Sequence, residues 1–207
     1  MSEIVYRKQG ACEEKVTSIM EPAEKKLHID FKALRDHCIE IRKEYNLYCN
    51  LFCEENRDIL TKVAAAFFFD IAAIIHRDWK LQVCKIMDRE EMNGKENITI
   101  DLINSRLQDN NLLNTEIEDT TAKLKCFGTK ISTARNKRLA HFDRKAHFNG
   151  QPLGGTSERE LLEFLSELQN YCNQVGELIG LGPLDFSCCA IQGDEQDLLK
   201  QLKLVVK

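Results

Sequence analysis

Arg135, Asn136 and His141 bring a guanidinium, an amide and an imidazole together within one short stretch, RNKRLAHFD at residues 135–143. These groups suit the metal-independent cleavage of an RNA phosphodiester bond. His141 can remove or donate a proton near neutral pH, and Arg135 offers a forked donor to two phosphate oxygens. Asn136 can hold the imidazole or the phosphate with its amide. The stretch therefore predicts a candidate catalytic site for phosphoryl chemistry.

A purely structural role for these residues is the alternative interpretation. Basic residues in the last turn of a helix complement its dipole, and a histidine near a helix end often serves only as a cap. Short motifs also match by chance. On spacing alone both interpretations stay open.

The charge around the motif is strongly asymmetric. Five basic residues against Asp143 alone give residues 135–147 a net charge of +4, and since the whole chain carries −4, the remainder carries −8. The residues expected to contact a substrate are Lys137, Arg138, Asp143, Arg144 and Lys145. This distribution favours one anion-attracting site on an acidic body over a general surface for coating nucleic acid.

The position of the motif on its helix predicts a shared site. At about 100° per residue, Arg135 falls about 20° from Leu124, on the apolar stripe of the same helix. A buried guanidinium needs a polar pocket or a partner subunit to receive it. Arg135 and His141 are also about 120° apart, so one protomer cannot easily direct both at one phosphate. We therefore expect a two-fold homodimer in which both copies of the motif line one groove.

Cysteine usage and the apolar runs indicate a reducing compartment and no membrane span. The nine cysteines are odd in number and scattered, and the charged N-terminus shows no signal-peptide pattern, so we expect a cytoplasmic protein. Cys49 and Cys53 are one helical turn apart, but no second pair completes a metal site, and small apolar core residues are the simpler interpretation. The most apolar run, Val63–Ile75, contains Asp70 and is too short to cross a bilayer. We expect no metal ion, no cofactor and no membrane partner.

The apolar periodicity predicts an all-α, up-and-down bundle of four long helices with short accessory helices. The first long helix runs from Asp30, an N-cap candidate, to about Cys53. The second, at about residues 57–77, is apolar on almost every face, which is typical of a helix at the centre of a bundle.

The second half of the chain supplies the other two long helices. One begins near Asn114 and delivers the motif at its C-terminal end. Ser157 and Glu160 have the spacing of a capping box and open the other helix, which ends before Gly180. The loop between the two helices, about residues 142–156, is long, and loops of that length are usually functional or mobile.

Short elements complete the predicted architecture. Two short helices, at about residues 79–87 and 99–109, flank a polar loop that contains Asn93-Gly94, and no strand pattern is present. A last amphipathic helix has one apolar face, at about residues 198–206, which covers either the bundle or a partner, and packing on the bundle is the default expectation. The chain is thus divided into an N-terminal extension at residues 1–29, a helical bundle at residues 30–182, and a linker with an amphipathic helix at residues 183–207.

The motif resembles the signature of the HEPN superfamily, in which an Arg and a polar residue precede a His at a short interval. Here Arg135 and Asn136 precede His141, with five residues between the Arg and the His. The whole stretch up to Asp143 looks like the abortive-infection AbiU-type branch of that superfamily. The resemblance covers about residues 31–180 and extends to three further stretches, at Leu47–Phe52, Phe67–Phe69 and Gly94–Ile100.

The resemblance implies a helical bundle that dimerises and, in many members, a metal-independent ribonuclease. It makes Arg135 and His141 the catalytic candidates and Asn136 the polar supporting residue. We expect an RNA endonuclease of a prokaryotic defence or toxin–antitoxin type system, with an antitoxin or other defence-system protein as a further partner. The alternative is a noncatalytic dimeric module that binds a nucleotide or a partner protein. Related toxins commonly carry a Tyr, where AMP is attached, at the position of Asp143, so we do not expect regulation by AMP transfer here.

Overall fold

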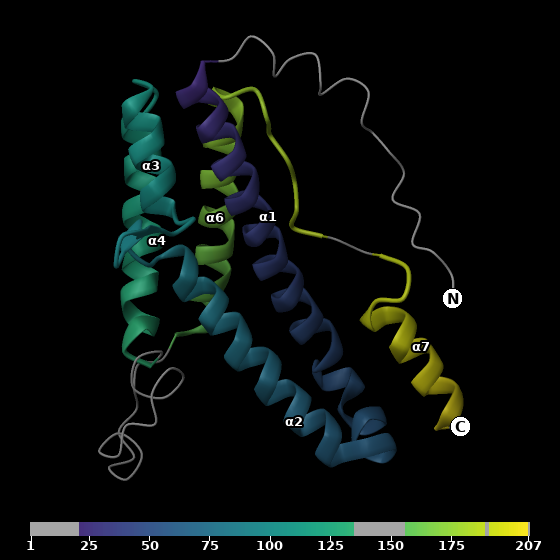
Figure 1. The fold of residues 1–207 in the computed structure, drawn as a ribbon. Coiled ribbons are helices and arrows are strands. Elements are labelled where there is room, and N and C mark those ends of the chain that lie inside the picture. Colours follow the sequence, from purple (N-terminus) through teal and green to yellow (C-terminus); the bar gives the residue numbers. More distant parts are fainter. Residues whose placement is uncertain (1–20, 135–155, 189–190, 207) are drawn as a thin grey trace.

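The computed structural model describes residues 21–134, 156–188 and 191–206. Within these residues the chain is all-α apart from one small hairpin, as the sequence predicts (Figure 1). The four long helices are α1 (Pro22–Leu51), α2 (Glu54–Ile86), α4 (Thr115–Ala134) and α6 (Glu158–Leu178). The short elements are β1 (Glu91–Met92), β2 (Lys95–Glu96), α3 (Ile100–Asp109) and α7 (Glu195–Val205).

The first helix begins at Pro22, so the expectation of a helix start at Asp30 is wrong. Proline is favoured at the first helical position because its fixed φ suits the helix and an N–H there would have no helical partner. Leu27 and Phe31 are fully buried in the core. The turns before Asp30 therefore belong to the bundle, although the sequence assigned them to an extension.

The second helix is continuous where the sequence predicts two helices. Residues 57–77 and 79–87 were expected to be separate, yet both lie in α2. No Gly or Pro interrupts this stretch, and Trp79 and Val83 pack into the core, so nothing ends the helix near residue 78. Its one residue with non-helical backbone angles is Ala64, where φ of −163° and ψ of 71° mark a kink.

The polar loop after α2 forms a β-hairpin, which corrects the expectation of a chain without strands. β1 pairs antiparallel with β2. Asn93 and Gly94 make the two-residue turn with φ of 56° and 73°. The Asn-Gly dipeptide suits this turn because both positions need positive φ. The strands are only two residues long and exposed, so they leave no apolar alternation in the sequence.

Three predicted helix starts are confirmed by side-chain caps. At α3, Thr99 Oγ1 accepts a hydrogen bond from the backbone N–H three residues later at 3.2 Å. At α4, Asn114 Oδ1 accepts the equivalent bond at 3.0 Å. At α6, Ser157 and Glu160 form the predicted capping box. Each cap satisfies an N–H group that the first helical turn leaves unpaired.

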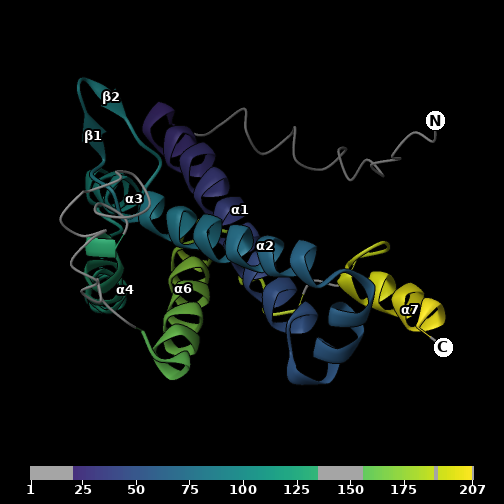
Figure 2. The ribbon, with the colours of Figure 1, turned by 90° about the horizontal axis from the view of Figure 1, so that it is seen from below.

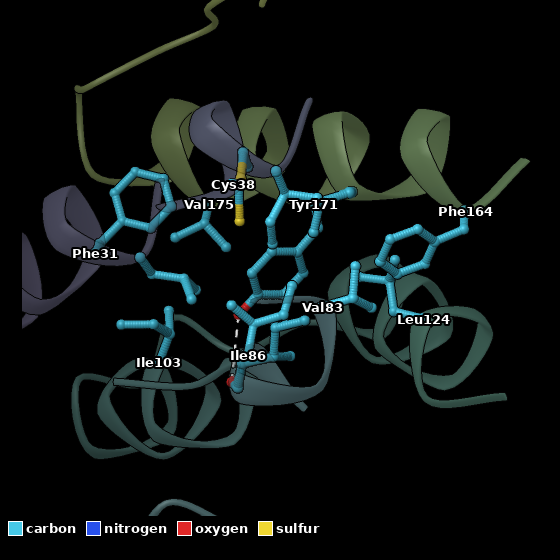
Figure 3. Close-up of a cluster of buried hydrophobic side chains, with 14 of the residues drawn as sticks. Phe31, Cys38, Val83, Ile86, Ile103, Leu124, Phe164, Tyr171 and Val175 are labelled. Carbon is cyan, nitrogen blue, oxygen red and sulfur yellow. Dashed lines mark hydrogen bonds between the residues drawn. The ribbon is translucent and has the colours of Figure 1, made fainter. Parts of the chain in front are cut away.

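Tyr171 of α6 lies within the hydrophobic core, among side chains from several helices (Figure 3). Its side chain is fully buried, and its hydroxyl donates to Asn104 Oδ1 of α3 at 2.9 Å. Burial raises the pKa of Tyr171 well above its usual value, so the hydroxyl keeps its proton. Apolar neighbours in the same core include Phe31, Val83, Leu124, Phe164 and Val175. This core joins α4 and α6 to α1 and α2.

The second helix is not the central helix that its apolar sequence predicts. Phe67 and Ile74 are both exposed, and their spacing of seven residues, beyond the kink at Ala64, puts them on one side of the helix. We call these two residues the apolar face of α2. Leu60 and Phe68 are buried instead, where they pack with Leu199 of α7. Helices cover only part of α2 within the described residues, so a helix that is apolar all round leaves one face exposed.

The last helix, α7, packs against α1 and α2 (Figure 2). This confirms the prediction that it covers the bundle. It does not cover the whole of α2. An 18-residue window of α2 is apolar enough to cross a membrane by length and composition, and few of its residues are buried. This window is longer than the run Val63–Ile75 that the sequence singles out.

Candidate functional site

The end of α4 and the start of α6 meet at one end of the bundle (Figure 1). Lys130 Nζ lies 2.5 Å from Glu160 Oε1, which ties the last turns of α4 to the first turn of α6. One turn deeper, the rings of Phe127 and Phe164 stack with centroids 4.4 Å apart and planes 16° apart. These two contacts fix the chain on both sides of residues 135–155.

The capping box sets where α6 begins. Ser157 Oγ accepts a hydrogen bond from Glu160 N at 3.2 Å, and Ser157 N donates to Glu160 Oε2 at 2.8 Å. The Lys130 ammonium, together with the bonds from Ser157, lowers the pKa of Glu160 to about 2. Glu160 is therefore a carboxylate at neutral pH and holds both the helix start and the end of α4.

A cavity of about 250 Å³ lies beside the start of α6 and is walled by three helices and the residue before the cap. Its lining combines four aromatic rings with hydroxyl, thiol and carboxylate groups. The lining residues are Tyr45, Tyr48, Cys49, Ile75, His76, Trp79, Thr156, Ser157, Glu158 and Leu161. No single stretch of sequence makes this cavity, because α1, α2 and α6 each supply one side.

The aromatic walls are held in place by specific contacts. Trp79 is buried, and its Nε1 donates to the Ile41 carbonyl of α1 at 3.0 Å. The Tyr45 ring lies 6.3 Å from the Trp79 ring. Tyr48 of α1 stacks on His76 of α2 with centroids 5.8 Å apart and planes 27° apart. The cavity is thus bounded by flat surfaces whose positions the bundle determines.

Burial sets the protonation states of two of these rings. It lowers the pKa of His76, and the charge of Lys80 lowers it further. It also raises the pKa of Tyr45. At neutral pH His76 is therefore a neutral imidazole and Tyr45 a protonated phenol, so both can donate and accept hydrogen bonds.

The residues predicted from the motif lie outside the described residues. They are the catalytic candidates Arg135, Asn136 and His141, and the substrate-binding candidates Lys137, Arg138, Asp143, Arg144 and Lys145. Their mutual geometry, and the shared two-fold site inferred from it, stay predictions. What the structure describes is the helix end that leads into them and the capped helix that follows.

The cavity residues were missed in the sequence. Tyr45 and Tyr48 belong to an apolar stripe and are interpreted from their spacing as core residues, although both are only partly buried. Trp79 was expected to open a separate short helix. One signal in the sequence could have indicated the cavity. His76 is the one histidine of a strongly apolar helix, and Trp79 follows it three residues later on the same side of that helix.

Cys49 corrects the expectation that the Cys49–Cys53 pair forms part of the core. Cys49 is exposed and lines the cavity. Cys53 is half-buried, and its Sγ accepts a hydrogen bond from Asn56 Nδ2 at 3.1 Å. Over residues 21–134, 156–188 and 191–206, no cluster of three or more His, Cys, Asp or Glu side chains could hold a metal ion.

Comparison with known proteins gives one family assignment. The AbiU2 family model matches residues 24–198, which is most of the chain. The chain matches none of the curated proteins and none of the solved structures with which it was compared. The matched residues reach into all four long helices and include the stretch at residues 135–143. The chain therefore belongs to the AbiU2 family of HEPN proteins.

Proposed function

We propose that the protein is a metal-independent RNA endonuclease of a prokaryotic defence or toxin–antitoxin type system. The observation that carries the proposal is the complete Arg-Asn-x4-His motif within the matched region. The motif begins directly after Ala134, the last residue of α4, and α6 begins at the same end of the bundle. This supports a site at that end.

The proposed reaction uses the RNA's own 2′-hydroxyl as the nucleophile. Its oxygen attacks the adjacent phosphorus, and the bond from phosphorus to the 5′-oxygen breaks. One group accepts the proton of the 2′-hydroxyl and another donates a proton to the leaving 5′-oxygen. His141 performs one of these transfers, and Arg135 stabilises the charge on the phosphorane oxygens. The products are a 2′,3′-cyclic phosphate and a 5′-hydroxyl.

Supporting residues bind the substrate around this centre. Asn136 positions the imidazole or the phosphate with its amide. Lys137, Arg138, Arg144 and Lys145 neutralise neighbouring phosphates, and Asp143 orients His141. Binding that depends on several cations weakens as salt concentration rises, because the counterions released from the phosphates then gain less entropy.

We further propose a cytoplasmic two-fold homodimer without a membrane partner. The apolar face of α2 is a surface that a second copy can cover. Insertion of α2 into a bilayer is disfavoured, because Asp70 lies inside its apolar run and would enter the hydrocarbon.

The test of the endonuclease is cleavage by purified protein in the presence of EDTA. Diverse RNAs, including tRNA, mRNA and phage-derived transcripts, are incubated with the parental protein and with His141→Ala. We expect cyclic-phosphate ends from the parent and a loss of about 10²- to 10⁴-fold in rate from the variant. His147→Ala is the matched control, since it removes an imidazole from the same stretch outside the motif.

Two results would overturn the endonuclease. One is cleavage that requires a divalent ion. The other is a His141→Ala protein that retains more than about a tenth of the parental rate, because proton transfer by His141 predicts a far larger loss. The noncatalytic module predicts a different pattern. In pull-downs from the native host, partner binding would be unchanged by His141→Ala, and neither form would affect growth.

A further inference from the structure

The cavity beside the start of α6 has the size and chemistry of a subsite for one nucleobase. We propose that it holds one unpaired base of single-stranded RNA, guanine above the other three, and so gives the endonuclease a sequence preference. The substrate class rests on the proposed function. The location and the base preference rest on the described residues of α1, α2 and α6.

The volume of the cavity selects the size of the ligand. At about 250 Å³ it lies below the roughly 300–1,000 Å³ of sites that enclose a drug-sized ligand. A single planar base is of the appropriate size, whereas the sugar and phosphates of the strand must stay outside. An unpaired base turned out of an RNA strand presents itself in this way.

The walls suit a flat aromatic ligand. Tyr48 and His76 stack on each other and form one wall, while Tyr45 and Trp79 form another. The Arg42 guanidinium lies 6.0 Å from the centroid of the Tyr45 ring and supports it from its own helix. Because Trp79 is tied to the α1 backbone, these surfaces exist before any ligand arrives. Stacking on preformed aromatic surfaces is how proteins bind bases in single strands.

The polar groups in the lining favour a base with N–H donors on its Watson–Crick edge. Glu158 lies close enough to Tyr45 for its charge to affect that hydroxyl, so an acceptor and a hydroxyl stand together in the cavity. A carboxylate accepts hydrogen bonds from two adjacent N–H donors, and guanine is the base whose Watson–Crick edge presents two N–H donors side by side. The neutral His76 imidazole adds one donor and one acceptor.

The position of the cavity connects it to the proposed chemistry. Thr156 and Ser157 line it and directly follow residue 155, the last residue of the stretch that contains the motif. Lys130, five residues before Arg135, is paired with Glu160, two residues after Glu158. In this proposal, the base held here belongs to a nucleotide close to the reacting phosphate in the strand.

The experiment uses the full-length protein and the four ribonucleoside 3′-monophosphates as probes. Binding is followed by calorimetry and by the fluorescence of Trp79, which is the single tryptophan of the chain and lines the cavity. We expect saturable binding that changes Trp79 emission, with the guanosine compound binding most tightly. Glu158→Gln should reduce that preference, because the carboxylate no longer accepts both donors.

Variants of the stacking wall test the location. Tyr48→Ala and His76→Ala should each weaken binding by roughly 5- to 150-fold, the range expected from the loss of one base-stacking partner. Tyr48→Phe retains the ring and should bind as the parent does. Phe69→Ala, an exposed aromatic of α2 outside the cavity, is the matched control. Circular dichroism confirms that each variant is folded.

The result that overturns the subsite is parental affinity in both Tyr48→Ala and His76→Ala, or no saturable binding of any of the four probes in the millimolar range. Neither result concerns cleavage, which is measured separately. Protein that cleaves RNA but fails these tests overturns the subsite alone. Protein that binds guanosine monophosphate through Tyr48 but never cleaves RNA supports the subsite and overturns the endonuclease.

Discussion

The Lys130 ammonium and the Glu160 carboxylate join α4 to α6 across 2.5 Å, at the point where the chain leaves one helix for the motif and returns in the other. Glu160 also completes the capping box of α6 with Ser157. One carboxylate thus performs two structural tasks. The geometry of this end of the bundle depends on its negative charge.

The charge of Glu160 predicts a pH dependence of stability. Its pKa is about 2 in the folded protein against an ordinary 4.5. Between these values the unfolded chain binds a proton that the folded chain does not, so the stabilisation is complete above about pH 4.5 and is lost as the pH falls towards 2. We expect Glu160→Gln to lower the melting temperature at pH 7 and to lose less stability than the parent on acidification.

Thermal melts at pH 7 and pH 3, followed by circular dichroism, measure this difference. Glu163→Gln is the matched control, because Glu163 is one turn later on α6, forms an ion pair with exposed Arg159 and takes no part in the capping box. An equal loss of melting temperature in the parent and in Glu160→Gln would contradict the assigned role.

The buried hydroxyl of Tyr171 makes a second prediction. Tyr171→Phe leaves the Asn104 side chain without the donor 2.9 Å away and should reduce the free energy of unfolding by about 1–3 kcal/mol. Urea denaturation measures the change. Tyr48→Phe, at a half-buried tyrosine outside the core, should change stability by less than about 0.5 kcal/mol. Equal effects of the two substitutions would argue against a specific role for the buried hydrogen bond.

The apolar face of α2 predicts the oligomeric state. Phe67→Lys combined with Ile74→Lys should convert the proposed dimer to a monomer, because two charges would be buried without partners in the interface. Light scattering after size-exclusion chromatography measures the mass. Ile98→Lys is matched in exposure to Ile74, at 46% each, and should leave the dimer intact. A monomeric parent that floats with lipid vesicles would show instead that a membrane covers this face.

The shared site predicts complementation between inactive chains. Arg135→Ala and His141→Ala chains are coexpressed with different tags, and the heterodimer is purified through both. If each site takes Arg135 from one protomer and His141 from the other, one of the two sites is intact and activity returns. Each variant alone stays inactive. A heterodimer as inactive as the single variants, or a fully active monomer at low concentration, excludes the shared site.

Local features of the fold could be predicted because their causes are local. The caps at Thr99, Asn114 and Ser157 depend on residues three positions apart, and the structure confirms all three. The four long helices follow from apolar residues that recur with the helical period. Pro22 is also a local signal for a helix start, and Leu27 and Phe31 extend the apolar period backwards from Leu34. Asp30 is the stronger N-cap by residue type, which is why the predicted start is too late.

The exposure of α2 could not be predicted from its own sequence. An apolar run on every face shows that the helix seeks burial, but it does not show which neighbours cover it. The structure places α1 on one side and α7 over Leu60 and Phe68, and leaves Phe67 and Ile74 exposed. Burial depends on contacts between distant segments, which periodicity within one segment does not encode.

The sequence by itself determined the candidate chemistry of this protein. Arg135, Asn136 and His141 are close in the chain, so their types and spacing are readable without any structure. Only the tertiary structure decided that Tyr45, His76 and Glu158 line one cavity. These residues come from three helices, and no local pattern in the sequence links them to one another. Helix packing brings them together, because the core around Tyr171 fixes where α1, α2 and α6 meet.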